Sequence, residues 1–519
     1  MKSTHYRMLT MGYAQIFLVV VALVALPWAA SAAQMGTAMQ GQAAAPKEVQ
    51  VQWQPYIPEI PAGVCPECNL GKVNRQLPKP AMKLPEGLQA PSLPETQAGP
   101  MALPGDLSFF KKHLLTDAES STSTSNVLEP TTAQYGNKIL YTGNWFAAKS
   151  IDGGTTFTYI NPYTAFTPPS GMNFCCDQEV IYDRTRGMWI WSLLYINPTV
   201  TGGANRIALS TDLNTWWYYD FNYSTTELPD YPHLRLTDNF VYWTTNQFNP
   251  GFRATRILRL PLTDMRFAKG FGYGWWETGD VFNFVVAKNW GLQSTVYFAS
   301  NYILAGPYNN IRVYTWQETS GTIYGADIEV SAWNWSPFTC TAPDGTNPCG
   351  RMDDRILGAA ITNWGAPGVS DKVLWLSWNA APISGRAMVY TYVVKINANN
   401  WSLIGYADIY NGSYAWGYTA ISPNDRGHLG LATNQLGGTA YTAFYVSLYD
   451  DYTPSPPPGW QVWAVGVGNQ GPSDAKWGDY NCVDRNYPKG FQWIASGHHK
   501  LTTDAVRPWF ARFGRFRDK

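Results

Sequence analysis

The 519-residue chain is poor in charge and has no excess of either sign, which excludes several classes of protein. Only 14% of its residues are charged, against about 25% in an average soluble domain. Its 37 basic residues balance 37 acidic ones, whereas nucleic-acid binding needs clustered Lys and Arg on a basic domain. A nucleic-acid partner, a coiled coil and a disordered acidic chain are therefore not expected.

Long apolar runs are also scarce. The run from Ile16 to Leu26 follows Lys2 and Arg7 and precedes Ala30-Ser31-Ala32. This is the layout of a secretory signal peptide, and the run is too short to span about 30 Å of hydrocarbon. An uncleaved anchor is the alternative. We expect residues 1–32 to be a signal peptide, and the mature protein to be secreted or periplasmic with no membrane span.

Cysteine is sparse, at seven residues. Cys340 and Cys349 flank a turn-rich segment and are predicted to form a disulfide that contributes about 2 to 3 kcal/mol. Cys65 and Cys68 have C-x-x-C spacing without a second such pair, which favours a local disulfide over a redox or zinc site. The odd count leaves at least one thiol free or paired between chains. The pairing of Cys65, Cys68, Cys175, Cys176 and Cys482 stays open.

Proline is concentrated at one end of the chain, because residues 33–104 hold 12 of the 36 Pro. Proline lacks a backbone donor and favours extended neighbours, so this segment is predicted to be a semi-rigid linker or a surface arm without regular strands. Residues 107–115 fit a short helix. An arm of this kind offers a route to a protein partner.

Aromatic residues and glycine are abundant, with 24 Trp, 32 Tyr and 46 Gly, and a β-rich pattern repeats from residue 129 onward. Each repeat contains a β-rich segment that ends in Asn, in most copies directly after a small residue, and the last copy has Gly497 instead. The anchors are Asn144, Asn197, Asn246, Asn301, Asn379, Asn434 and Gly497. Repeats of about 40 to 60 residues with three or four strands are typical of propeller blades.

The repeats predict an all-β fold in which residues 105–519 form a seven-bladed β-propeller, with six blades as the alternative. The last repeat has room for only three strands, so a strand within about residues 105–128 must complete the last blade and remove an open sheet edge. The longest repeat contains Cys340 and Cys349, and its extra length is predicted to be a disulfide-pinned loop.

The segment Ser150-Ile151-Asp152-Gly153-Gly154-Thr155-Thr156-Phe157 fits the pattern S-x-D-x-G-x-T followed by an aromatic residue, and residues 210–217 are a degraded copy. The sequence resembles the Asp-box, or BNR-repeat, propellers and bacterial secreted sialidase-like proteins, over roughly residues 125–516. The resemblance implies that the box is a turn between outer strands. Sialidases also carry an F/Y-R-I-P motif, which has no match here, so sialidase activity is not predicted.

Carboxylates recur near the start of the first strand of several blades, the strand that lines a propeller's channel. They are Glu129, Asp177, Asp230, Asp354 and Asp479. If these carboxylates face the same channel mouth, they repel one another. At least one of them should then have a raised pKa or share a cation. A raised acid beside an ionised carboxylate suits glycoside hydrolysis. Alternatively, each carboxylate caps backbone N–H groups or pairs with Arg184, Arg235 or Arg355.

Candidate catalytic residues follow from this pattern. Asp177, Asp230 and Asp479 are candidates for acid, base or nucleophile, and Arg355 for an anion clamp. Tyr231 and His233 are a candidate proton-transfer pair for a polysaccharide lyase, or else packing residues. No cofactor and no metal site are predicted, although a divalent cation such as Ca²⁺ at the channel mouth is the alternative.

Candidate substrate-binding residues are the carboxylates Glu129 and Asp354 and the aromatic residues Trp416, Tyr418 and Trp477. Aromatic loop segments at 273–276, 333–335 and 414–418 offer rings on which sugars stack, although aromatic residues also build cores. The repeated Asn residues either hydrogen-bond sugar hydroxyls or link blades, and their regular register favours the second role.

The leading prediction is an exported propeller that binds extracellular polysaccharide or glycan at its channel mouth. If it also cleaves this carbohydrate, it is a glycoside hydrolase or a polysaccharide lyase. The alternative is a non-catalytic extracellular interaction scaffold.

Overall fold

The computed structural model describes residues 47–50, 52–56, 107–120, 127–249, 251–304, 309–363, 372–450, 462–472, 475–501 and 506–519. The chain divides into Met1–Gln42 and Ala43–Lys519, and all described residues belong to the second unit. The predicted signal peptide, Cys65, Cys68 and most of the proline-rich arm lie outside the described residues. No helix among the described residues has the length and apolar character needed to cross a bilayer.

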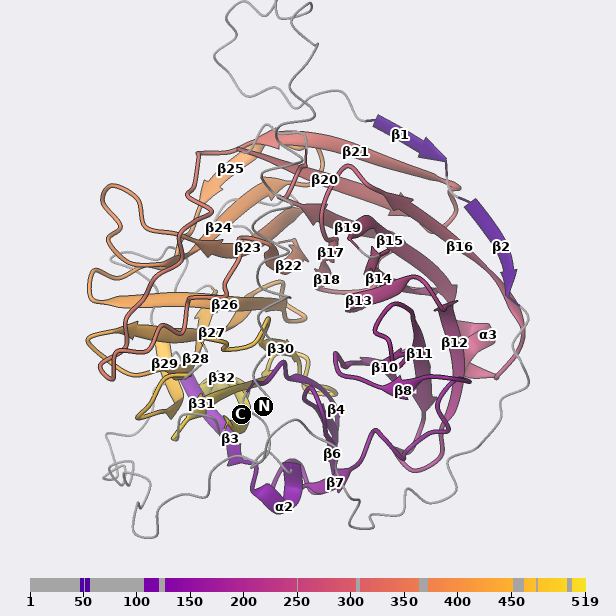
Figure 1. Ribbon diagram of the computed structural model, residues 1–519, viewed down its shortest axis with the longest axis horizontal. Helices are drawn as coiled ribbons and strands as arrows, with labels where there is room; N and C mark the ends of the chain where they lie inside the picture. Colours follow the sequence, from indigo (N-terminus) through magenta and orange to yellow (C-terminus); the bar gives the residue numbers. More distant parts are fainter. Residues whose placement is uncertain are drawn as a thin grey trace, which may run out of the picture. The chain divides into compact units, whose positions relative to one another are not determined.

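Seven sheets follow one another along the chain and surround a common centre (Figure 1). Blade 1 contains β4 (Thr131–Tyr135), β5 (Lys138–Thr142), β6 (Ala147–Ser150) and β7 (Thr158–Ile160). Blade 2 contains β8 (Asn173–Phe174), β9 (Glu179–Asp183), β10 (Met188–Ile196), β11 (Gly203–Ser210) and β12 (Trp217–Ser224). Blade 3 contains β13 (Leu228–Leu236), β14 (Phe240–Phe248), β15 (Phe252–Pro261), β16 (Phe271–Thr278) and β2 (Gln52–Tyr56).

The remaining four sheets continue the same arrangement. Blade 4 contains β17 (Val285–Val286), β19 (Thr295–Ser300), β20 (Asn310–Gln317), β21 (Thr322–Glu329) and β1 (Lys47–Gln50). Blade 5 contains β18 (Lys288–Asn289), β22 (Ile356–Thr362), β23 (Val373–Ala380), β24 (Tyr390–Asn397) and β25 (Leu403–Tyr406). Blade 6 contains β26 (Tyr414–Pro423), β27 (Leu429–Gly438), β28 (Ala443–Tyr449) and β29 (Val462–Val467). Blade 7 contains β30 (Cys482–Arg485), β31 (Trp493–Lys500), β32 (Val506–Arg515) and β3 (Leu107–Leu114).

The first strands of the blades form the wall of the central channel. Contacts run from β4 to β9, from β9 to β13, onward through β17, β18, β22 and β26, and from β30 back to β4. The short helices α2 (Asp117–Ser120) and α3 (Leu262–Arg266) and the 3-10 turn η2 (Phe516–Asp518) lie in connections or at the end of the chain. The predicted seven-bladed propeller is therefore confirmed.

Closure joins the two ends of the propeller in one sheet, as predicted. Strand β3 pairs antiparallel with β32 and completes blade 7, so residues 107–114 form a strand and not the short helix that their sequence fits. The arm also contains two strands that its proline content did not predict. Strands β1 and β2 pair with β21 and β16 and become the outer strands of blades 4 and 3.

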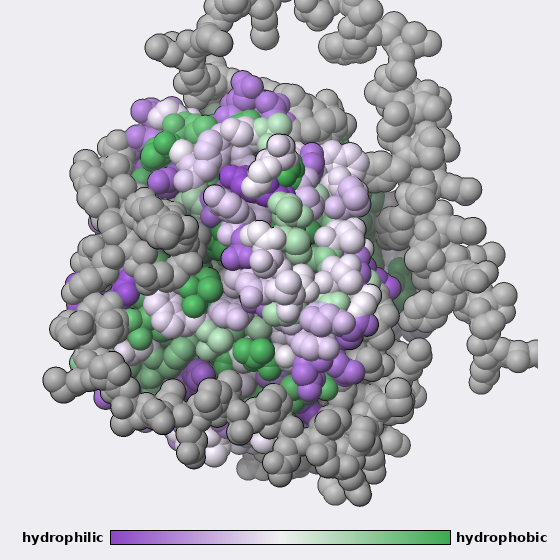
Figure 2. Space-filling model, turned by 90° about the vertical axis from the view of Figure 1, so that its left-hand side faces the viewer, coloured by the Kyte–Doolittle hydropathy of each residue, from purple (hydrophilic) through white to green (hydrophobic). Residues whose placement is uncertain are grey.

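Aromatic side chains fill the spaces between neighbouring blades. One apolar cluster joins Leu140 and Ile160 of blade 1 to Trp189 and Trp191 of blade 2, and similar clusters join the other neighbours. Burial of such large rings explains the high aromatic content. On the side that carries blades 5 and 6, hydrophobic and hydrophilic residues are interspersed over the described surface (Figure 2).

Two disulfides occur among the described residues. The predicted bond between Cys340 and Cys349 lies in the long connection from β21 of blade 4 to β22 of blade 5. The second joins the sequence neighbours Cys175 and Cys176 in blade 2, and Cys482 is a buried free thiol.

Candidate functional site

The innermost strands of blades 2, 3 and 6 are irregular near their starts, and each irregularity carries a residue with positive φ. In blade 3 Tyr231 (φ 55°) lies in a bulge between Asp230 and His233, and in blade 6 Tyr418 (φ 56°) lies in a similar bulge. In blade 2 Asp177 (φ 40°) lies between β8 and β9. Left-handed backbone at non-glycine residues costs about 1 to 3 kcal/mol each and concentrates at functional sites.

Carboxyl groups from blades 1, 2 and 3 meet at this end of the channel. Glu129 is hydrogen-bonded to Asp177, and Asp177 is hydrogen-bonded to Asp230. We call these three residues the carboxyl row. Glu129 and Asp177 are buried, at 3% and 9% exposure. Two carboxyls can share a hydrogen bond only when at least one is protonated, so this arrangement favours a proton shared within the row.

Burial and mutual repulsion raise the pKa values of the row. Burial, followed by the charge of Asp479 from blade 7, raises the pKa of Glu129 to about 7. Burial and the charges of Glu129, Asp230 and Asp479 raise the pKa of Asp177 well above its usual range. Burial also raises the pKa of Asp230. The direction of these three pKa shifts is the one that repulsion among carboxylates at the channel mouth would produce, and the catalytic roles assigned to these residues from the sequence stay predictions.

Arg355 lies beside the row and links it to neighbouring acids. Its Nε is 2.7 Å from Oδ2 of Asp353, its Nη2 is 3.6 Å from Oδ2 of Asp479, and its guanidinium lies 4.2 Å from the ring centre of Tyr231. The guanidinium therefore pairs with Asp353 rather than with the predicted Asp354. The Asp354 carboxylate accepts a hydrogen bond from Nε1 of Trp333 at 2.9 Å.

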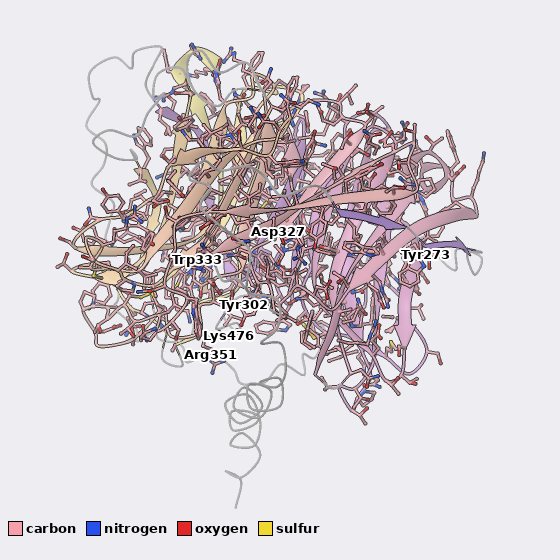
Figure 3. The ribbon with its side chains drawn as sticks, turned by 90° about the horizontal axis from the view of Figure 1, so that it is seen from above. Tyr273, Tyr302, Asp327, Trp333, Arg351 and Lys476 are labelled. Carbon is pink, nitrogen blue, oxygen red and sulfur yellow. A yellow bond between two sulfur atoms is a disulfide. The ribbon has the colours of Figure 1, made fainter. Side chains whose placement is uncertain are left out.

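Lys476 is a second cation at this end, and the sequence analysis missed it. Although burial lowers its pKa, the charges of Glu129, Asp479 and Asp177 raise it overall. Figure 3 places Lys476 next to Arg351 at one edge of the propeller. Its position three residues before Asp479 was the only available sequence signal.

The repeated asparagines hold the segments that carry these groups. Asn144 accepts from the Glu129 N–H at 2.7 Å and donates to its Oε2 at 2.6 Å. Asn301 donates to the carbonyl oxygen of Asp354 in the next blade at 2.5 Å, and Asn379 accepts from the Tyr418 N–H in the next blade at 2.8 Å. These contacts support the structural role favoured for the repeats. Asn434 differs, because neither polar atom of its buried side chain has a hydrogen-bond partner.

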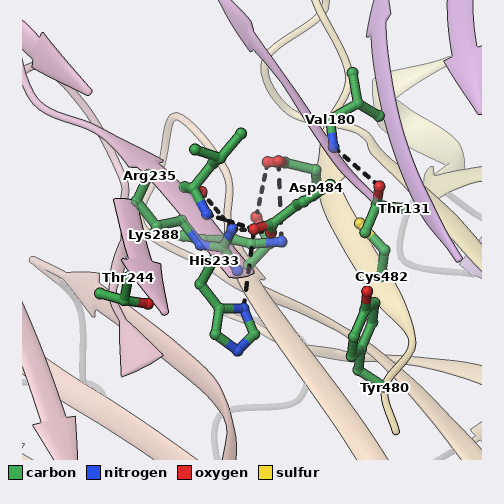
Figure 4. Close-up of polar contacts among 12 residues, drawn as sticks. Thr131, Val180, His233, Arg235, Thr244, Lys288, Tyr480, Cys482 and Asp484 are labelled. Carbon is green, nitrogen blue, oxygen red and sulfur yellow. Dashed lines mark hydrogen bonds and ion pairs between the residues drawn. The ribbon is translucent and has the colours of Figure 1, made fainter. Parts of the chain in front are cut away.

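Tyr231 and His233 touch but are not hydrogen-bonded to each other. Their rings meet edge to face at 4.7 Å, and both the Tyr231 hydroxyl and the His233 Nε2 are buried without a partner. His233 lies 3.9 Å from Glu179, and burial holds its pKa well below the usual value (Figure 4). No direct hydrogen bond therefore connects Tyr231 and His233 for the proton transfer that a lyase would need.

The predicted aromatic binding residues are mostly buried. Trp416 packs against Tyr445 at 5.2 Å, and Trp477 stacks on His498 at 4.1 Å. Tyr418 is buried with an unpartnered hydroxyl. Among the rings of residues 333–335, Trp333 is buried and Trp335 is 56% exposed. Most of these rings therefore pack in the core. The surrounding sequence does not indicate which rings the neighbouring residues cover.

A different set of charges lines the channel beyond the row. Arg235 pairs with Glu179, and Lys288 donates to the carbonyl oxygen of Val483 and lies 3.9 Å from Asp484 (Figure 4). A narrow cavity is bordered by Glu179, His233, Arg235, Lys288, Tyr480 and Cys482, among others. Arg184 pairs with Asp425 at 3.3 Å. Of the three arginines that could neutralise the predicted carboxylates, only Arg355 contacts one of them.

Within the described ranges, no group of three or more His, Cys, Asp or Glu side chains is arranged to hold a metal ion. The segment from Ser150 to Phe157 joins β6 to β7, and Asp152 in it accepts hydrogen bonds from the N–H groups of Thr155 and Thr156 at 2.9 and 3.0 Å. It is a turn between the two outer strands of blade 1, and its assignment as an Asp-box stays a prediction.

Comparison with protein-family models and with curated proteins finds no match. Solved structures with a similar arrangement include the α-L-arabinofuranosidase Arb93A of Fusarium graminearum, at 10% identity and a TM-score of 0.38 over 78% of this chain and 98% of that one. The NanB sialidase of Streptococcus pneumoniae is 11% identical, with a TM-score of 0.38 over 64% of this chain and 68% of that one. A putative exo-β-1,3-galactanase of Bifidobacterium bifidum is 10% identical, with a TM-score of 0.29 over 56% and 95%. Structural similarity at these identities and TM-scores gives no information about the activity of this protein.

Proposed function

We propose that the protein binds a carbohydrate at the end of the channel that carries the carboxyl row, and that Asp177 protonates a glycosidic oxygen there. The observation that carries the proposal is the carboxyl row, in which the buried Asp177 is hydrogen-bonded to Glu129 and to Asp230. Asp177 lies between Glu129 and Asp230, and its pKa is raised by burial and by three neighbouring acids. A carboxyl kept neutral beside ionised ones is the arrangement that general acid catalysis of glycoside hydrolysis uses.

The second catalytic carboxyl must come from outside the row. Glycosidases separate their two carboxyls by about 5 Å or more, whereas hydrogen-bonded carboxyls lie much closer. Asp479 is the best candidate, because it belongs to blade 7, acts electrostatically on all three row residues and has a side chain that is 34% exposed. In this assignment Asp479 is the base or nucleophile, and Arg355 orients it.

The balance of charge at this end favours a neutral sugar over an anionic one. With Asp177 protonated, five other acids still outnumber three bases: Glu129, Asp230, Asp353, Asp354 and Asp479 against Arg351, Arg355 and Lys476. A sialic or uronic acid would bring a further negative charge to this cluster. The two disulfides support an oxidising extracellular or periplasmic location.

A non-catalytic interaction scaffold is the second candidate function. It is favoured by the burial of Glu129, Tyr231 and Tyr418, whose exposures are 3%, 2% and 3%. In this case the shared proton stabilises the packing of the blades and reaches no substrate.

A polysaccharide panel separates the two candidates. The purified mature protein is tested for binding and for new reducing ends or unsaturated products, beside Asp177→Asn and Asp230→Asn. Asp117→Asn is the matched control, since Asp117 is exposed on α2. We expect products with the native protein and the control but not with Asp177→Asn. Binding without products supports the carbohydrate site but refutes the catalytic role of Asp177. Neither binding nor products across the panel refutes the carbohydrate proposal and favours the scaffold.

A further inference from the structure

The innermost strand of blade 2 is interrupted where the corresponding strands of blades 3 and 6 carry only small bulges. Strands β8 and β9 both pair with β10, and between them Cys175 to Gln178 oppose only Leu193 and Leu194. In blade 3, Tyr231 and Pro232 oppose the single residue Thr245. Blade 2 thus inserts more chain at this point than blade 3, and Asp177 lies within the insertion.

Both flanks of this insertion are fixed to the blade. On one side the Cys175 N–H donates to the carbonyl oxygen of Leu194 at 2.9 Å. On the other side the Gln178 side chain donates to the carbonyl oxygen of Gly143 at 2.5 Å and accepts from Nε1 of Trp191 at 3.0 Å. Only the short piece between these anchors, Cys176 and Asp177, is left to absorb the extra length.

The disulfide between Cys175 and Cys176 restrains this piece covalently. It closes a small ring through the peptide bond that joins the two residues, which removes backbone freedom immediately before Asp177. Asp177 needs this restraint, because its φ of 40° is unfavourable for a side-chain-bearing residue. Repulsion from Glu129, Asp230 and Asp479 also favours its departure once the row ionises.

We propose that the Cys175–Cys176 disulfide is a positioning element that holds the Asp177 carboxyl between Glu129 and Asp230. The catalytic consequence of this proposal rests on the proposed function. The effect of the disulfide on the shared proton does not depend on catalysis. Both cysteines are half-buried, so a reductant can reach the bond. Reduction by an added dithiol breaks the sulfur–sulfur bond and leaves two thiols, while the dithiol gives up two electrons and two protons and becomes a disulfide. The freed segment then lets Asp177 leave the row.

The test measures how the free energy of unfolding depends on pH. This dependence reports the protonation of the carboxyl row and needs no substrate. Because the pKa values of the row are raised in the folded protein, native stability falls as pH rises from about 4 to above 7. The exported chain is compared with Cys175→Ala/Cys176→Ala, and Cys340→Ala/Cys349→Ala is the control that removes the other disulfide. We expect the Cys175→Ala/Cys176→Ala variant to lose the part of the slope of unfolding free energy against pH that Asp177→Asn also loses. The Cys340→Ala/Cys349→Ala control should keep the native slope.

A double-mutant cycle shows whether the disulfide acts through Asp177. In the Asp177→Asn background, removing the Cys175–Cys176 bond should leave the slope unchanged. If the Ala variant does not fold, the native protein is reduced, alkylated at Cys175 and Cys176 as verified by mass spectrometry, and titrated in the same way. A native slope without the bond overturns the proposal. A reduced slope in a protein that processes no carbohydrate supports the positioning role and refutes only the proposed function.

Discussion

Glu129 gives the clearest energetic prediction, because its environment raises its pKa from 4.5 to about 7. At 1.36 kcal/mol per pKa unit, ionising it in the folded protein costs about 3 kcal/mol. The sign follows from linkage: a carboxyl with a raised folded pKa stabilises the fold below its unfolded pKa, and this stability is lost as pH rises through about 7. The substitution Glu129→Gln removes this ionisation while keeping an oxygen that accepts from Asn144.

The assay is denaturant unfolding of native and variant protein at a series of pH values from 4 to 8.5. We expect similar stabilities near pH 4 and a relative gain for Glu129→Gln that grows to about 3 kcal/mol above pH 7. Glu329→Gln is the matched control, because Glu329 is exposed on β21 and should show no such trend. Parallel curves for Glu129→Gln and native protein would refute the account of a buried, proton-sharing row.

Three further predictions concern other parts of the propeller. Gly478→Ala should cost about 1 to 3 kcal/mol of unfolding free energy, because Gly478 has φ 143° and its Cβ would meet the carbonyl oxygen of Leu128. Asp152→Ala should cost about 1 kcal/mol, as loss of a capping side chain does, and should leave carbohydrate binding unchanged in calorimetry. Deleting residues up to Leu114 removes β3, together with β1 and β2, and exposes the edge of β32. The truncated protein should aggregate in light scattering, and a stable monomer would contradict the closure of blade 7.

The blade count was predictable because it depends on local, repeated patterns. Six Asn anchors and a final Gly mark the second strands, and the closing strand followed from the shortness of the last repeat. The strands β1 and β2 were not predictable in the same way. Each is short, and they gain their hydrogen bonds from β21 and β16, which lie far away in the sequence.

The site was predictable in type but not in detail. Register alone placed Glu129, Asp177, Asp230 and Asp479 at one end of the channel, since the starts of first strands meet there. The choice of Asp353 over Asp354 as the partner of Arg355 depends on which way each side chain turns from an irregular segment. The burial of Trp416 and Trp477 depends on neighbouring blades, and one sequence does not show which rings those blades cover.

The pH dependence of product release from the best substrate of the panel tests the central claim most directly. If Asp177 delivers the shared proton, native turnover should fall as pH rises and the row ionises, and Asp177→Asn should abolish it. The substitution Glu129→Gln removes a neighbouring charge that raises the pKa of Asp177, so it should move the fall in turnover to lower pH. An unchanged pH profile in Glu129→Gln, or full turnover in Asp177→Asn, would contradict the account.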